Sequence, residues 1–202
     1  DDWKPTAQLE NLKIRAELLI KIRQFFFERN VLEVETPLLA RTTATDVHIQ
    51  SLEVPRMGPA LDAIFYLQTS PEFAMKRMLA AGSGAIYQIC KAFRQGEVSR
   101  THNPEFTMLE WYQPGYSQGD LINEVESLVS SLLEIQAIPK LSYREVFQQQ
   151  LDFDPHNITL KRLNSCAAEY IDVGTQKLSQ TDLLQLLMDA IVVPHLPKNI
   201  FV

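Results

Sequence analysis

Two apolar, strand-like runs flank a polar stretch in the middle of the chain, and this pattern limits the folds open to it. The first run covers 86–94 and the second covers 105–112. Both carry the aliphatic and aromatic residues that strands favour. Two such runs joined by one connection predict an antiparallel hairpin, and structureless loops of this length are usually functional. We therefore expect an antiparallel sheet with a functional loop over 95–104.

Helices are predicted on the N-terminal side of this hairpin. The first ends near Asn30, a residue that tolerates the left-handed conformation after a helix, and 31–37 is then extended and closed by a proline. A second helix is predicted from Pro71 to a point before Gly82. The first helix carries an apolar stripe with steps of three and four residues. Its members are Leu12, Ala16, Leu19, Ile22 and Phe26.

Beyond Tyr116 the pattern becomes helical. Ser142 with Glu145, and Ser179 with Asp182, are typical of the capping boxes that begin helices. The end of the chain, 197–202, is typical of a strand that has just begun, which indicates that sequence follows. Helices around an antiparallel hairpin predict an α+β fold, in one domain over 1–202. The apolar stripe of the first helix after Tyr116 is formed by Leu121, Val125, Leu128 and Leu132.

Composition argues against some classes of protein. The net charge is -6, whereas a non-specific nucleic-acid binder needs a basic surface to displace phosphate counterions. The chain has 2 cysteines, Cys90 and Cys166, far apart and without ligand-like spacing, as is typical of a reducing compartment. No apolar stretch is typical of a signal peptide or a membrane span. We expect a cytoplasmic protein.

The second run of the hairpin contains a candidate binding site. Alternate residues of a strand share a face, so Phe106, Met108, Glu110 and Tyr112 point the same way. A carboxylate between aromatic residues can form the floor of a pocket for a positively charged group. Arg94 directly precedes the polar loop and Arg100 lies within it. Arginine binds polyphosphates bidentately.

Each of these residues also has a simpler interpretation. An arginine at a strand end is more often part of a surface ion pair, and a histidine such as His102 is more often an ordinary loop residue. Glu72 is placed where a carboxylate stabilises the first turn of a helix. Glu110 is harder to explain in this way, because acids are rarely buried without a partner.

Four segments together carry a resemblance to a known family. Phe-Arg-Gln-Gly-Glu at 93–97 and His-Asn-Pro-Glu-Phe-Thr-Met-Leu-Glu-Trp-Tyr at 102–112 resemble motif 2 of class II lysyl-tRNA synthetases. Val-Glu-Thr-Pro-Leu at 34–38 resembles motif 1, and 69–77 resembles the amino-acid-binding segment between them. The resemblance covers essentially the whole chain. Within the family it is closest to stand-alone relatives that attach a lysine-type amino acid to elongation factor P.

The resemblance implies roles for particular residues. Arg94 is implied to be catalytic, holding the α-phosphate of ATP and the substrate carboxylate as they react. The synthetases usually have Glu two positions after this arginine; here Gly96 stands there and Glu97 follows, so the adenine contact of that Glu is not assigned. The implied substrate-binding residues are Ser70, Pro71, Glu72, Glu110 and Tyr112. The implied ATP-binding residues are Arg94, Gln95, Gly96, Glu97, Arg100, His102, Asn103 and Phe106, with Phe106 stacking on adenine.

The implied reaction is an AMP-forming amide ligation. ATP activates (R)-β-lysine, or lysine, as an aminoacyl-adenylate, which is transferred to a lysine side chain of elongation factor P by a homodimer joined through motif 1. No tRNA or membrane partner is expected. The ligands of Mg²⁺ and a third motif are expected beyond Val202, so residues 1–202 alone are expected to be inactive. Two alternatives stay open: a catalytic fragment of a lysyl-tRNA synthetase, and an inactive paralogue that serves as a binding module.

Overall fold

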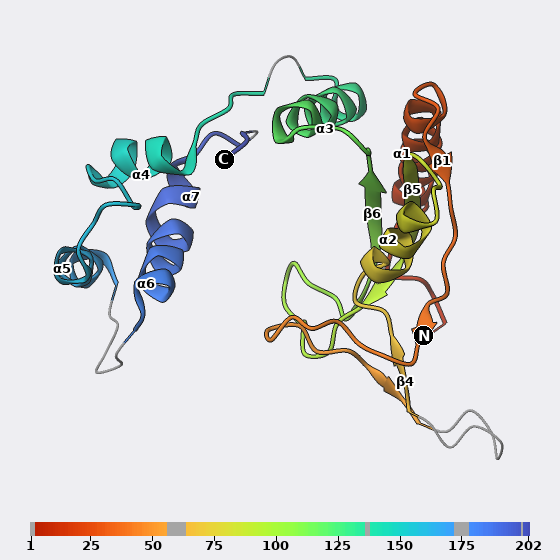
Figure 1. The fold of residues 1–202 in the computed structure, drawn as a ribbon, viewed down its shortest axis with the longest axis horizontal. Helices are drawn as coiled ribbons and strands as arrows, with labels where there is room; N and C mark the ends of the chain where they lie inside the picture. The colour runs from red at the N-terminus through yellow and green to blue at the C-terminus, as the bar shows by residue number, and fades with distance from the viewer. Residues whose placement is uncertain (1–2, 56–63, 136–137, 172–177, 199) are drawn as a thin grey trace. The chain divides into compact units, whose positions relative to one another are not determined.

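The computed structural model describes residues 3–55, 64–135, 138–171, 178–198 and 200–202 (Figure 1). The chain divides into two compact units, Asp1–Leu121 and Ile122–Val202, and each is described by itself. The first unit contains the sheet and the candidate site. The single domain over 1–202 stays a prediction. Within the described ranges, no helix combines the length and the apolar character that a membrane crossing requires.

The predicted hairpin forms the main sheet of the first unit. β5 (Ile86–Phe93) and β6 (Glu105–Tyr112) pair antiparallel over their whole length, with Gln88 opposite Glu110. A short strand, β1 (Leu32–Glu33), pairs parallel with β5 on its other edge, so the strand order is β1-β5-β6. Both long strands end within a residue of the predicted limits, which confirms the hairpin.

Helix α1 (Leu9–Phe27) covers one face of this sheet. Phe26 is fully buried there, with its ring stacked on Tyr87 at 4.4 Å and tilted against Trp111 at 5.4 Å between centroids. Asn30 follows the helix with φ 56°, as its sequence position predicts, and returns the chain to β1. Within the predicted apolar stripe, Phe26 at the C-terminal end is buried against the sheet, whereas Leu12 near the N-terminal end is 46% exposed.

Helix α2 (Glu72–Ala80) belongs to the opposite face. Met75 is fully buried in a cluster with Val34 and Ile86, against which Tyr112 packs. Pro71 is the N-cap residue, and Gly82 with φ 89° lies two residues beyond the last helical residue, so this helix lies within the predicted limits.

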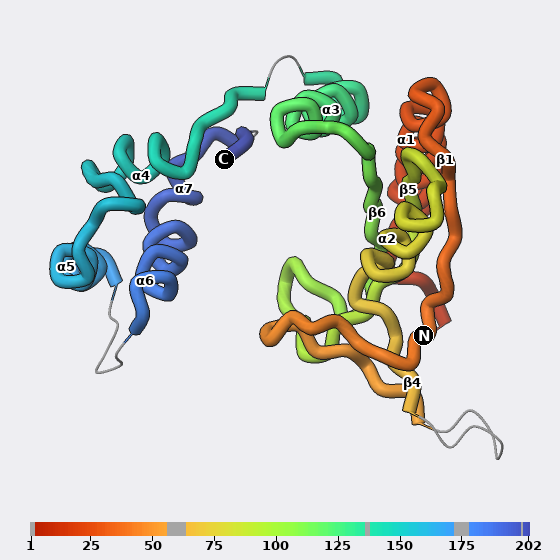
Figure 2. Tube along the Cα trace, viewed as in Figure 1, coloured from red at the N-terminus to blue at the C-terminus, as the bar shows by residue number. Residues whose placement is uncertain are grey.

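A second small sheet lies beside the hairpin loop. It has the order β2-β4-β3, formed by Leu39–Ala40, Phe65–Leu67 and Glu53–Val54. The segment 41–51 connects β2 toward β3, and it lies next to the loop 94–104, because the Gln95 amide donates to the Gln50 carbonyl at 2.8 Å (Figure 2). The two irregular segments therefore meet at one end of the hairpin.

The second unit is helical. Helix α3 (Gln118–Leu133) leads into it, and α4 (Tyr143–Leu151), α5 (Leu160–Tyr170) and α6 (Gln180–Leu187) follow. A π-helical turn, η1 (Met188–Val192), and the short α7 (Val193–His195) close the element order. Phe147, Leu163 and Leu187 are fully buried in the common core.

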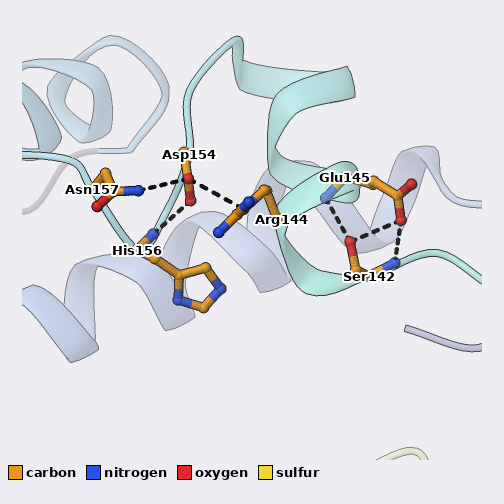
Figure 3. A network of polar contacts seen from close by, with 6 residues as sticks. All are labelled: Ser142, Arg144, Glu145, Asp154, His156 and Asn157. Carbon is orange, nitrogen blue, oxygen red and sulfur yellow. Dashed lines mark hydrogen bonds and ion pairs between the residues drawn. The ribbon is translucent and has the colours of Figure 1, made fainter.

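Both predicted capping boxes are present in this unit. The Ser142 side chain accepts the Glu145 amide while the Glu145 carboxylate accepts the Ser142 amide (Figure 3), and Ser179 and Asp182 do the same for α6. Figure 3 also shows Asp154 accepting from Arg144 and from the backbone of His156. The strand predicted over 197–202 is represented by one bridge, between Phe201 and Lys140; residue 199 lies outside the described residues.

Candidate functional site

A cavity of about 620 Å³ opens on the sheet face that carries Glu110. Its size is in the range of small-molecule sites. Residues from four places in the sequence line it: the segment 37–51, residues 67–70 at the end of β4, the first turns of α2, and the hairpin residues Arg94, Met108 and Glu110. The hairpin thus brings the predicted acid and the predicted arginine to one cavity.

Glu110 and Tyr112 form a hydrogen-bonded pair on β6. The Tyr112 hydroxyl donates to Glu110 Oε1 at 2.7 Å, across the two-residue spacing that puts both on one face. Burial raises the pKa of Tyr112 well above its ordinary value, and the hydrogen bond to Glu110 and the charges of Glu110 and Glu72 act in the same direction. Tyr112 therefore stays a proton donor, and it orients the carboxylate beside the cavity.

Glu72 supplies a second carboxylate from the first turn of α2. Its backbone amide donates to Ser70 Oγ at 3.0 Å, so Ser70 caps this turn in addition to lining the cavity. Pro71 between them is buried and fixes the start of the helix. The Glu72 carboxylate pairs with Lys76 Nζ, one helical turn on, at 2.5 Å, and both side chains are about half exposed.

Arg94 enters the cavity from the end of β5. Its backbone amide donates to the Pro104 carbonyl at 2.9 Å, which closes the base of the hairpin loop. The guanidinium lies 5.1 Å from the Phe106 ring centroid and 3.6 Å from the Glu97 carboxylate. Its Nε is buried and has no hydrogen-bond partner among the described residues. Arg94 is therefore held in place while part of its donor capacity is unused.

The rest of the predicted ATP-binding residues lie along the loop 95–104. Gly96 has φ 80°, a conformation that side chains rarely adopt, so this turn favours glycine. Farther along, His102 Nδ1 lies 2.9 Å from the Ser99 hydroxyl, and the His102 carbonyl accepts the Ser99 amide at 3.0 Å. These bonds give the loop a fixed tip. Gln95, Gly96, Arg100, His102 and Asn103 are exposed and do not line the cavity.

Sequence reasoning missed part of the cavity wall. The segment 42–46 contributes hydroxyl groups and the Asp46 carboxylate, and α2 contributes Arg77. This segment has neither strand nor helix periodicity, so no pattern marked it. The cavity combines carboxylates at Asp46, Glu72 and Glu110 with guanidinium groups at Arg77 and Arg94. An amino acid with a second amino group matches this distribution, because its ammonium groups can pair with the carboxylates and its carboxylate with a guanidinium group.

No group of three or more His, Cys, Asp or Glu side chains in the described parts of the chain is arranged to hold a metal ion. Cys90 and Cys166 are free thiols, and burial raises the pKa of each.

Comparison with known proteins identifies the family. The model of the class II tRNA synthetases (D, K and N) matches residues 2–179. The chain belongs to this family.

Class II synthetase relatives with curated names agree with the motifs. The chain is 46% identical over 201 residues to the elongation factor P–(R)-β-lysine ligase of Pseudoalteromonas translucida (strain TAC 125). It is 44% identical over 201 residues to the protein of that name from Klebsiella pneumoniae (strain 342). Each alignment covers 98% of this chain and 62% of the relative, so the chain spans less than two thirds of their length.

The α+β prediction is confirmed for this class II synthetase domain, with an antiparallel hairpin between helices. The family match includes all of the predicted site residues, from Ser70 to Tyr112. The structure brings Ser70, Glu72, Arg94 and Glu110 to one cavity and places Tyr112 and Phe106 against two of them. The binding roles of these residues stay predictions.

Proposed function

We propose that the protein uses ATP to activate a lysine-type amino acid, (R)-β-lysine or lysine, and transfers it to a lysine side chain of elongation factor P. The observation that carries the proposal is the convergence of Glu72, Glu110 and Arg94 on one cavity. The names of the curated relatives support the choice of substrate and acceptor.

The carboxylates select the amino acid. A lysine-type substrate has two ammonium groups and one carboxylate, and Glu72 and Glu110 each offer a fixed charge to an ammonium group. Charge-assisted hydrogen bonds of this kind are roughly twice as strong as neutral ones. Tyr112 keeps one Glu110 oxygen occupied at 2.7 Å, which leaves the carboxylate oriented for the ligand.

Arg94 serves the first chemical step. A carboxylate oxygen of the amino acid attacks the α-phosphorus of ATP; the new P–O bond forms while the bond to pyrophosphate breaks. Negative charge develops on the phosphoryl oxygens, and an arginine aimed there stabilises it without a covalent intermediate on the protein. The unused buried Nε of Arg94 provides such a donor. The described residues offer no ligand cluster for Mg²⁺, so we assign no step to the metal.

Transfer completes the reaction. The lysine amine of the acceptor attacks the adenylate carbonyl, an amide forms, and AMP leaves as the amine loses a proton. The cavity residues need only position the two reactants, because a well-oriented pair gains a large effective concentration.

Label transfer tests the proposal. The full-length protein is incubated with ATP and labelled (R)-β-lysine or lysine, and is offered elongation factor P or total tRNA. We expect label on elongation factor P, and its loss when the acceptor lysine is replaced by alanine. Charging of tRNA with no label on elongation factor P would instead support a lysyl-tRNA synthetase. No pyrophosphate exchange and no transfer would support a binding module.

A further inference from the structure

Gln88 is a buried polar residue that the proposed reaction does not use. It lies in β5 directly opposite Glu110 in β6 and is 1% exposed. Residues directly opposite in an antiparallel pair point to the same face, with Cβ atoms about 4.5–5.5 Å apart. Gln88 therefore lies beneath the cavity, next to the acid that lines it.

Thr36 fixes the orientation of the Gln88 amide. Its hydroxyl donates to Gln88 Oε1 at 3.0 Å, and Thr36 is itself buried. The hydroxyl of Thr36 therefore occupies the oxygen end of the amide, which leaves Nε2 as the free end.

Nε2 of Gln88 has no hydrogen-bond partner within the described ranges. A buried donor without an acceptor lowers stability, so such groups are rare in folded proteins and are concentrated at functional sites. A carboxylate can accept several hydrogen bonds, and Glu110 accepts one from Tyr112. The closest chemical match to the unused donor is therefore the carboxylate across the strand pair.

We propose that Gln88, held by Thr36, is a positioning residue: when the amino acid binds, its free Nε2 donates to the Glu110 carboxylate and directs it toward the ammonium group of the ligand. Tyr112 and Gln88 then hold the carboxylate from two sides. Gln88 does not touch the substrate. Its contribution is a second hydrogen bond that fixes the carboxylate in the bound complex, where the acceptor is charged and the bond is strong. This inference rests on the proposed function.

The thiol of Cys90 is the competing acceptor. Cys90 is two residues along β5 on the same face, and its sulfur already accepts from Gln68 Nε2 at 3.3 Å. Burial raises the pKa of the Cys90 thiol, and the Gln68 and Gln88 amides both act to lower it, so Gln88 lies near this sulfur although its geometry falls short of a hydrogen bond. A thiol sulfur is a weak acceptor compared with an ionised carboxylate. If Gln88 served Cys90 instead, removal of the thiol would have the same effect as removal of the amide.

The test compares binding of (R)-β-lysine and ATP, by calorimetry, in the full-length protein and in variants. Gln88→Met keeps the length of the side chain and removes the donor. We expect its Kd for (R)-β-lysine to rise about 10- to 100-fold, the usual effect of losing a hydrogen bond to a charged group. The Kd for ATP should be unchanged. The melting temperature should change little, because the variant removes one unpaired buried donor, Gln88 Nε2, and leaves another, the Thr36 hydroxyl, without its acceptor. Thr36→Val should shift the same Kd by a smaller factor.

Two controls make the result specific. Tyr87→Phe removes a hydroxyl from the neighbouring residue on the opposite face, where it donates to Glu33 at 2.8 Å, so the melting temperature should fall while both Kd values hold. Cys90→Ala should leave the Kd for (R)-β-lysine unchanged.

An unchanged Kd for (R)-β-lysine in Gln88→Met would overturn the inference, as would equal losses for both ligands or an equal loss in Cys90→Ala. If the unmodified protein bound neither (R)-β-lysine nor lysine, the proposed function itself would fail, and the inference with it.

Discussion

The surroundings of Glu110 are determined by its position in strand β6. Its neighbours in sequence, Leu109 and Trp111, point to the face covered by α1, while Glu110 shares the cavity face with Met108 and Tyr112. The alternation was sufficient to predict this group. It was not sufficient to single out Gln88, because only the strand register places that residue opposite Glu110.

Replacement of Glu110 by Gln should weaken amino-acid binding far more than ATP binding. Truncating one partner of a buried hydrogen-bonded charge pair costs about 2–5 kcal/mol, and the partial exposure of Glu110 favours the low end. Calorimetric titration of the full-length protein with (R)-β-lysine, lysine and ATP measures the difference.

The matched control is Glu105→Gln, in the same strand on the opposite face. Glu105 pairs with Lys91 at 3.0 Å, and both side chains are about half exposed, so this ion pair contributes little. We expect no change in either affinity. Equal weakening for the amino acid and ATP in Glu110→Gln would contradict its assignment to the amino-acid pocket.

The elements that sequence predicts best here are the long ones. β5, β6, α1 and α2 all lie near their predicted limits, because each has enough residues to show a period or a capping signal. The sheet β2-β4-β3 was not predicted, since its strands have two or three residues and show no alternation. The cavity wall from 42 to 46 was missed for the same reason.

Phe26 joins two of these elements, and its loss should destabilise the first unit. The side chain is fully buried between Tyr87 and Trp111, so Phe26→Ala leaves a cavity between α1 and the sheet and should cost about 3–5 kcal/mol. Urea denaturation followed by tryptophan fluorescence measures this, because Trp111 is one of the contacts.

Tyr116→Ala serves as the comparison, because Tyr116 is an aromatic residue of the same unit that is 49% exposed. Its cost should be well below that of Phe26→Ala. A similar cost for the two variants would mean that α1 does not depend on Phe26 for its attachment to the sheet.

At the scale of the whole molecule, α1 has an apolar surface that this single chain leaves open. Leu9, Leu12 and Ile20 are 76%, 46% and 66% exposed. Their spacing places all three on one side of the helix. Exposed apolar stripes of this kind usually mark an interaction surface. The predicted homodimer would cover them, since α1 leads into the segment that resembles motif 1.

We therefore expect the full-length protein to sediment as a dimer, and Ile20→Glu to shift it toward monomer without loss of helical circular dichroism. The charge would be buried at the two-fold interface, which is costly for an unpaired carboxylate. Leu160→Glu, at a 47% exposed position of α5, should remain dimeric. A protein that sediments as a monomer at micromolar concentration would contradict the dimer.

The ion pair between Glu72 and Lys76 changes what a binding measurement on this site reports. The ammonium group of Lys76 already pairs with the Glu72 carboxylate, which the ammonium group of the ligand is expected to bind. Binding is then an exchange of one ammonium for another, and the measured affinity is the difference between the two contacts. An exposed pair one helical turn apart is worth only about 0.2–0.5 kcal/mol, so the exchange weakens the ligand by no more than about twofold. For that small loss, Lys76 holds the carboxylate in place before any substrate arrives.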